Sequence, residues 1–187
     1  RFNPETGEVE KRSFWRLEPS AEYRFYPKIG SVVNYDALGV YYDSYFDENW
    51  VETDRLVKFF YKVKFTNTSY LEVNYNERFT QLFFDTDVTF TDQAAISKGG
   101  YDYRSVRIFY KTDARKRFNA SSSVEYGSYY SGEKLTSNLT LNYRAQPWGI
   151  FAIQYDQNEI WLPNGQRASL HLIGPKFEFS FTRSVFF

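Results

Sequence analysis

Residues 56–65, LVKFFYKVKF, decide the fold because their apolar and charged side chains alternate. One set of alternate positions holds Val57, Phe59, Tyr61, Val63 and Phe65, and the other holds Leu56, Lys58, Phe60, Lys62 and Lys64. A period of two is typical of a β-strand, whose successive side chains point to opposite faces of a sheet. The stretch therefore predicts a strand with one apolar face and one largely polar face.

The same alternation recurs along the rest of the chain, as in residues 118–126, FNASSSVEY, and 139–145, LTLNYRA. Short segments rich in the turn-forming residues Gly, Pro, Asn, Asp and Ser separate these runs. We predict an all-β fold, a nine-stranded antiparallel meander, with residues 185–187 as the start of a tenth strand. Gly174-Pro175 interrupts the last full strand and predicts a β-bulge there. The predicted strands are residues 14–27, 32–46, 51–65, 70–89, 101–113, 118–130, 135–145, 150–162 and 168–182.

The composition agrees with such a segregation of side chains. The 187 residues are 21% aromatic, yet the mean hydropathy is negative and 23 Lys and Arg balance 23 Asp and Glu. Nucleic-acid binding is not expected, because no basic excess is available to neutralise phosphates. The absence of Cys excludes a disulfide framework and a thiolate metal site. His171 is the single histidine, and we interpret it as structural; we expect no cofactor, no metal and no catalytic residue in this chain.

Strand length indicates the environment of the sheet. The predicted strands run about 11 to 20 residues, whereas most strands of globular sheets have about 5 to 6. A strand that crosses a bilayer at a tilt needs about 9 to 11 residues. We therefore predict that residues 14–187, after a lead-in segment at residues 1–13, form strands of a transmembrane β-barrel, with a soluble β-sandwich as the alternative. The odd number of complete strands favours part of a larger barrel, because barrels of this class close with an even number.

The links between strands predict the orientation of the barrel, because outer-membrane barrels have short periplasmic turns and longer outer loops. Tight links are expected on the periplasmic side at residues 28–31, 66–69, 114–117, 146–149 and 183–184. The links assigned to the outside are residues 47–53, 91–100, 131–134 and 157–167.

The polar side chains of the strands would face the lumen of such a barrel. They could line a conduction path or a ligand cavity, or they could neutralise one another, since charges that face a lumen must be hydrated or paired. The three lysines of residues 58–64 are the most one-signed group, and Glu72 on the neighbouring strand is placed to offset part of their charge. The lumen-lining candidates are Lys58, Lys62, Lys64, Glu72, Arg78, Arg107, Lys111, Glu125 and Arg144.

The four tryptophans, Trp15, Trp50, Trp148 and Trp161, all fall at or near predicted strand ends. Such positions favour an interfacial girdle, in which an amphipathic ring sits at the level of the lipid headgroups. Stacking platforms for sugars are the alternative. The position of Trp148 beside a tight turn favours the girdle most, and Trp50 and Trp161 lie beside predicted outer loops.

Two stretches carry a family resemblance, FNPETGEV at residues 2–9 and FSFTRSVFF at residues 179–187. Together with long alternating strands closed by basic tight turns, they resemble the C-terminal barrel of a family of Gram-negative outer-membrane proteins. Members of that family carry an N-terminal domain resembling carbohydrate-binding module family 9. The resemblance covers essentially the whole chain. It implies an outer-membrane location, a preceding carbohydrate-binding-like domain with the first barrel strands, and a terminal strand that follows residues 181–187.

Three functions are compatible with these predictions. The first is an anchor and scaffold for an extra-barrel carbohydrate-binding-like domain, or a subunit of an outer-membrane assembly. The second is a pore or transporter for small polar or saccharide solutes. The third is an outer-membrane hydrolase whose catalytic residues would lie outside this chain. The expected partners are the lipid bilayer, other outer-membrane proteins or further parts of the same polypeptide, and carbohydrate.

Overall fold

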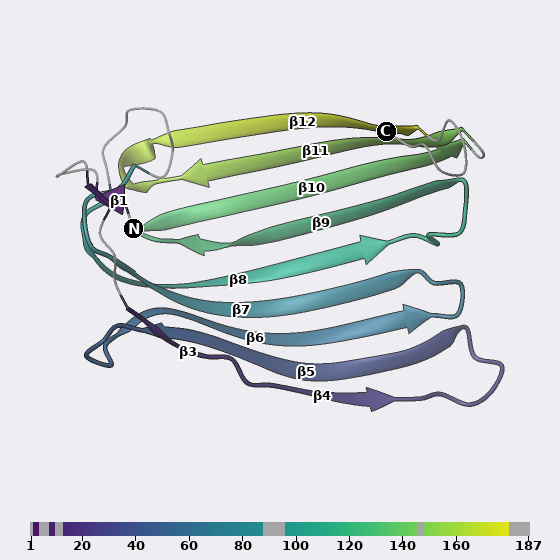
Figure 1. Ribbon diagram of the computed structural model, residues 1–187, viewed down its shortest axis with the longest axis horizontal. Helices are drawn as coiled ribbons and strands as arrows, with labels where there is room; N and C mark the ends of the chain where they lie inside the picture. Colours follow the sequence, from purple (N-terminus) through teal and green to yellow (C-terminus); the bar gives the residue numbers. More distant parts are fainter. Residues whose placement is uncertain (1, 4–7, 10–12, 88–95, 146–147, 180–187) are drawn as a thin grey trace.

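The described part of the chain is a curved antiparallel sheet (Figure 1). The computed structural model describes residues 2–3, 8–9, 13–87, 96–145 and 148–179. These residues contain β-strands and one short 3-10 turn, η1 (Pro163–Gly165). None of them belongs to a helix that is long and apolar enough to cross a membrane. Two short strands, β1 (Phe2–Asn3) and β2 (Glu8–Val9), pair with each other outside the main sheet.

The main sheet has ten strands, and each long strand pairs with its neighbours in sequence, which confirms the predicted meander. β12 forms one edge of the described sheet, and β3 and β4 both pair with β5 at the other edge, so the sheet is not closed. The strands are β3 (Trp15–Leu17), β4 (Ser20–Phe25), β5 (Val33–Phe46), β6 (Glu52–Phe65), β7 (Tyr70–Leu82), β8 (Gly99–Lys111), β9 (Phe118–Tyr129), β10 (Gly132–Ala145), β11 (Gly149–Trp161) and β12 (Arg167–Phe179).

The long strands, β5 to β12, have 12 to 14 residues each. The predicted bounds of two outer links are wrong. The link between β9 and β10 has only two residues, because β10 begins at Gly132 inside the predicted outer loop 131–134. Residues 157–161 of the predicted loop 157–167 likewise belong to β11, and Arg167 begins β12. Only the link of residues 83–98, of which 88–95 lie outside the described part, is long.

Proline has different effects at the two edges of the sheet. Pro19 separates β3 from β4, so the predicted strand 14–27 is two short strands, and its carbonyl oxygen accepts a hydrogen bond from the Tyr42 N–H at 3.0 Å. The bulge predicted at Gly174-Pro175 is absent, because β12 pairs with β11 in unbroken register through both residues. An edge strand tolerates proline when its nitrogen faces away from the neighbouring strand. The predicted tenth strand, 185–187, lies outside the described residues.

The register places alternate residues on two different faces. We call the face that carries Lys58, Lys62 and Lys64 the inner face and the opposite one the outer face. Polar residues of the inner face are buried, such as Asn74 at 2% and Ser123 at 4% exposure, whereas large apolar residues of the outer face are exposed. This difference identifies the inner face as the concave one. The sheet therefore buries polar groups and exposes apolar ones.

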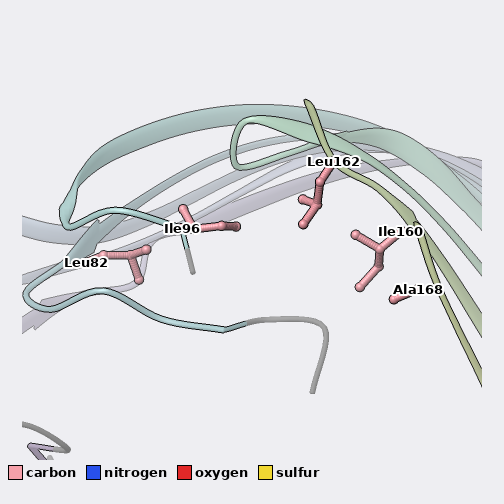
Figure 2. Close-up of a cluster of buried hydrophobic side chains, with 5 residues drawn as sticks. All are labelled: Leu82, Ile96, Ile160, Leu162 and Ala168. Carbon is pink, nitrogen blue, oxygen red and sulfur yellow. The ribbon is translucent and has the colours of Figure 1, made fainter. Parts of the chain in front are cut away.

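A small apolar cluster lies at one end of the inner face. Leu82 and Ile96 from the two ends of the long link gather there with residues of β11, β12 and the link between them, beneath the curve of the sheet (Figure 2). Tyrosines of β8, β9 and the short link after β9 pack against this cluster. The remaining cluster members are Ile160, Leu162 and Ala168, and the tyrosines are Tyr101, Tyr129 and Tyr130.

Gly39 shows how closely the inner face is packed. It pairs with Phe60 on β6, and the Phe60 ring covers it. A Cβ atom at this position would lie 2.2 Å from Phe60 Cζ and 2.8 Å from the carbonyl oxygen of Ala21. Position 39 must therefore be glycine for the Phe60 ring to occupy this place beside the Ala21 carbonyl group of β4.

We expect Gly39→Ala to lower the free energy of unfolding by about 1 to 3 kcal/mol, because the ring must move off its rotamer. Gly174→Ala is the matched control, since nothing lies within 4 Å of a Cβ atom there. It should be neutral or stabilising by less than about 1 kcal/mol. Urea titrations of the detergent-solubilised protein, followed by tryptophan fluorescence, measure both changes. Equal losses for the two substitutions would contradict the packing around Phe60.

Candidate functional site

The structure places all nine lumen-lining candidates on the inner face. Cross-strand pairs establish this placement, since directly opposed residues of an antiparallel pair point to the same side. Lys62 is opposite Glu72, and Arg107 is opposite Glu125. The other candidates follow from the alternation along the same strands and along β10. Whether this face borders a lumen stays a prediction.

The charge of Lys62 on β6 is offset by a carboxylate that lies two strands away. Lys62 Nζ forms an ion pair with Glu22 on β4 rather than with Glu72, which instead accepts a hydrogen bond from the Tyr70 hydroxyl. The pair reaches across β5, where the small residue Ala37 lies opposite Lys62 on the inner face. A small residue on the intervening strand thus decides the partner of Lys62.

The other two lysines of β6 contact aromatic rings. Lys58 Nζ lies 5.1 Å from the centroid of the Tyr41 ring, and Lys64 Nζ lies 5.9 Å from that of Tyr70. Lys64 also donates a hydrogen bond to the carbonyl oxygen of Thr68 at 3.3 Å. Cation–π contacts of this kind stabilise a charge that has no carboxylate beside it.

A hydrogen-bond network occupies the middle of the inner face. Ser105 Oγ donates to Glu125 Oε1 at 2.6 Å, and Asn76 Nδ2 donates to the same oxygen at 3.4 Å. A second chain of bonds crosses β9, β10 and β11, since Ser123 donates to Asn138, which in turn donates to Asp156 at 2.5 Å. Such cross-links satisfy polar groups that burial would otherwise leave unpaired.

The inner face holds a pocket of about 320 Å³ next to this network. Backbone pairing between β8 and β9 ends at Ser105 opposite Gly127, and beyond this point Ser128 Oγ accepts a hydrogen bond from the Arg104 N–H at 2.8 Å. Gly127 contributes no side chain, and a Cβ atom there would lie 2.0 Å from the Arg104 carbonyl oxygen. The pocket therefore lies where the β8–β9 ladder ends and the β8 backbone packs closely against Gly127.

The pocket brings together residues that the sequence predicted and residues that it did not. Arg78 and Glu125 were lumen-lining candidates, whereas Lys134 had been assigned to an outer loop. Lys134 Nζ lies 4.8 Å from the centroid of the Tyr129 ring. The alternation of β10 continues backwards to Gly132, and this signal could have located Lys134 on the inner face.

The tryptophans lie at both ends of the sheet. Trp15 and Trp50 stack on each other with ring centroids 5.4 Å apart and an interplanar angle of 8°. Trp161 ends β11 at this same end, whereas Trp148 precedes β11 at the opposite end and is exposed (Figure 1). These positions are compatible with two aromatic belts, and the girdle stays a prediction.

Three tyrosines of the outer face were missed by the sequence reasoning. The hydroxyl of Tyr75 donates to Glu77 at 3.0 Å, and that of Tyr126 donates to Glu133 at 2.7 Å. The hydroxyl of Tyr155 lies 2.8 Å from His171 Nδ1. The hydroxyl of each ring therefore reaches a polar group that lies nearer the Trp50 end. Their sequence signal is a tyrosine followed two residues later, on the same face, by a polar residue.

The outer face carries a continuous apolar belt, formed by exposed side chains of strands β6 to β12. Phe59, Ile108 and Ile173 are 50%, 51% and 64% exposed, respectively. Toward the end that holds Trp50, charged and polar residues replace the apolar ones on the same face. These residues include Arg55 on β6, Glu77 on β7, Arg104 on β8, Gln157 on β11 and His171 on β12.

The edge of the apolar belt runs diagonally across the strands. On β12 the edge lies at His171. Successive cross-strand pairs place His171 at the same level of the sheet as Tyr61 on β6. On β6, however, the first charged residue of the outer face is Arg55. The edge therefore shifts by about six residues, or roughly 20 Å, over a sheet width of about 29 Å. This slope corresponds to an angle of roughly 35° between the strands and the normal to the belt.

The described residues show no candidate metal centre, since no group of three or more His, Cys, Asp or Glu side chains could hold an ion. His171 Nε2 lies 2.9 Å from Ser169 Oγ, so both of its ring nitrogens have hydrogen-bond partners. Asp85 accepts a hydrogen bond from the Lys98 N–H at 2.8 Å across the base of the long link. These groups therefore hold local structure.

The ion pair across β5 predicts an energetic coupling between Lys62 and Glu22. Their side chains are only 16% and 23% exposed. A double-mutant cycle of Lys62→Gln and Glu22→Gln should give a coupling of about 1 kcal/mol in the free energy of unfolding. The same cycle with Glu72→Gln in place of Glu22→Gln is the control and should give almost none. A larger coupling to Glu72 than to Glu22 would contradict the pairing described above.

Comparisons with protein-family models, with curated proteins and with solved structures give no match to this chain. The resemblance carried by residues 2–9 and 179–187 therefore stays a prediction. The two faces of the sheet, the belt and the pocket are the features from which a function can be argued.

Proposed function

We propose that this chain forms part of the wall of an outer-membrane β-barrel and serves as a membrane anchor. The observation that carries the proposal is the exposed apolar belt of the outer face, opposite an inner face of buried polar residues. A water-soluble sheet places its apolar face inside and its polar face outside. The reverse arrangement is stable where acyl chains cover the apolar side and water or paired polar groups fill the other.

The slope of the belt supports the same proposal. Strands of outer-membrane barrels are tilted by about 35 to 45° from the membrane normal, so a flat hydrocarbon slab covers a diagonal band of their residues. The estimated slope of roughly 35° on this sheet lies within that range. The tyrosines at the belt edge support it further, because their rings lie on the outer face at the edge of the belt while their hydroxyls reach polar groups, as at a lipid headgroup boundary.

The open edges of the sheet bear on how the barrel would be completed. Unpaired N–H and C=O groups cost several kcal/mol each in hydrocarbon. In this proposal, further strands of the same polypeptide or of another outer-membrane protein pair with β12 and with the β3 and β4 edge. The assembled barrel would then anchor a soluble domain, for which the family resemblance suggests a carbohydrate-binding-like module.

A pore or transporter is the second candidate function. The polar inner face favours it, since hydrated or paired charges such as Arg78 and Glu125 would border a water-filled path. Conductance of the purified protein in planar bilayers separates the two candidates. An anchor with a filled interior should give no steady single-channel current, whereas a pore gives current steps.

Membrane association is tested first by fractionation of cells that produce the protein. We expect it to remain in the membrane pellet after a sodium carbonate wash and to require detergent for extraction. A periplasmic marker protein serves as the control and should be released. Extraction into buffer without detergent would favour the soluble β-sandwich and would contradict the anchor.

A substitution series tests which residues face lipid. Ile108→Arg lies in the middle of the belt and should lower the free energy of unfolding in liposomes by about 2 to 4 kcal/mol, because a charge near the bilayer centre is poorly solvated. Gln157→Arg is the matched control, since it lies beyond the belt on the same face and beside Glu159. It should change the free energy of unfolding by less than about 0.5 kcal/mol. Equal effects of the two substitutions would contradict burial of the belt in lipid.

A further inference from the structure

The pocket between β7 and β11 has the composition of an anion site. Two cations, Arg78 on β7 and Lys134 on β10, line it from opposite sides of Gly127. Neither side chain forms an ion pair within the described part of the chain. The charge of these two residues therefore exceeds that of the single carboxylate in the pocket, Glu125.

Glu125 is held by neighbours other than the two cations. Its Oε1 atom accepts hydrogen bonds from Ser105 at 2.6 Å and from Asn76 at 3.4 Å. These bonds hold the carboxylate toward β7 and β8, and neither cation lies within 4.0 Å of it as an ion pair. The pocket thus retains donors that are available to a guest with negative charge.

Further donors and rings complete the lining. Thr136 donates to Asn158 Oδ1 at 2.9 Å, which leaves the Asn158 amide N–H groups available as donors. Tyr103 and Tyr129 form a T-shaped pair with ring centroids 6.0 Å apart, and both rings line the pocket. Cations and amide donors bind oxyanions, while phenol rings contact the less polar body of a ligand.

From this arrangement we propose that the pocket binds a small organic anion, a carboxylate or phosphate group on a body about the size of a monosaccharide. The volume of about 320 Å³ is at the lower end of the range for ligand pockets. Arg78 and Lys134 hold the anionic group over Gly127, where no side chain intervenes. This binding does not require an open lumen, because all of the lining residues belong to adjoining strands of the described sheet.

The test uses D-glucuronate as the probe and D-glucose as its neutral counterpart, with binding to the detergent-solubilised protein measured by saturation-transfer NMR and calorimetry. Wild-type protein should bind glucuronate and should bind glucose at least tenfold more weakly. Competition with inorganic phosphate then tests whether the anionic group alone is enough for binding. If it is, phosphate should displace glucuronate. Absence of glucuronate binding, or equal binding of glucose, would overturn the proposal.

Variants locate the binding within the fold. Lys134→Gln and Arg78→Gln should each weaken glucuronate binding about tenfold, the worth of one charge-assisted hydrogen bond. Lys134→Arg keeps the charge and should retain binding. Lys111→Gln is the control, since Lys111 lies at the other end of the inner face and should leave binding unchanged. Loss of binding in Lys111→Gln, or wild-type binding in both pocket variants, would contradict the site.

Glucuronate binding and membrane anchoring are tested by independent measurements. Fractionation and the Ile108→Arg series report on the outer face, whereas glucuronate binding reports on the inner face alone. A protein that proves soluble could still bind the anion, and a membrane protein could fail to bind it. The native elution volume in gel filtration and the unfolding midpoint of each pocket variant show that the loss of binding does not arise from misfolding.

Discussion

The structure depends on the antiparallel register between strands that follow one another in sequence. From β5 to β12 each strand pairs with its predecessor, so alternation along one strand becomes two continuous surfaces across the whole sheet. A slip of one residue in any pair would send a row of lysines and glutamates to the apolar side. The two faces differ strongly in polarity, as in residues 56–65, so such a slip is unfavourable.

Small residues on the inner face decide what the polar side chains can reach. Ala37, opposite Lys62, lets the ion pair of Lys62 and Glu22 cross an intervening strand, Gly39 admits the Phe60 ring, and Gly127 admits the β8 backbone beside the pocket. At both glycines a Cβ atom would meet backbone or ring atoms at less than 3 Å. Both glycines therefore allow atoms of a neighbouring strand to pack closely against the backbone.

The outer face poses a different physical problem, since large apolar side chains are exposed over most of the sheet. A protein in water seldom exposes a contiguous apolar surface of this extent without a partner. The diagonal edge of the belt and the tyrosines along it suggest a flat apolar slab as that partner. Because the belt and the pocket lie on opposite faces, an anchoring role and a ligand-binding role would not compete for the same residues.

The sequence by itself determined the strands, their order and the division of residues between two faces. These properties are local, because the period of two and the turn residues act over a few positions, and all nine lumen-lining candidates accordingly share one face. The sequence could not determine the partner of Lys62, which lies 40 residues away on a strand that is not adjacent. Nor did it locate the pocket of Arg78, Lys134 and Tyr129. Only the tertiary structure decided these contacts, because they depend on which residues the register sets at the same level and on where the β8–β9 ladder ends.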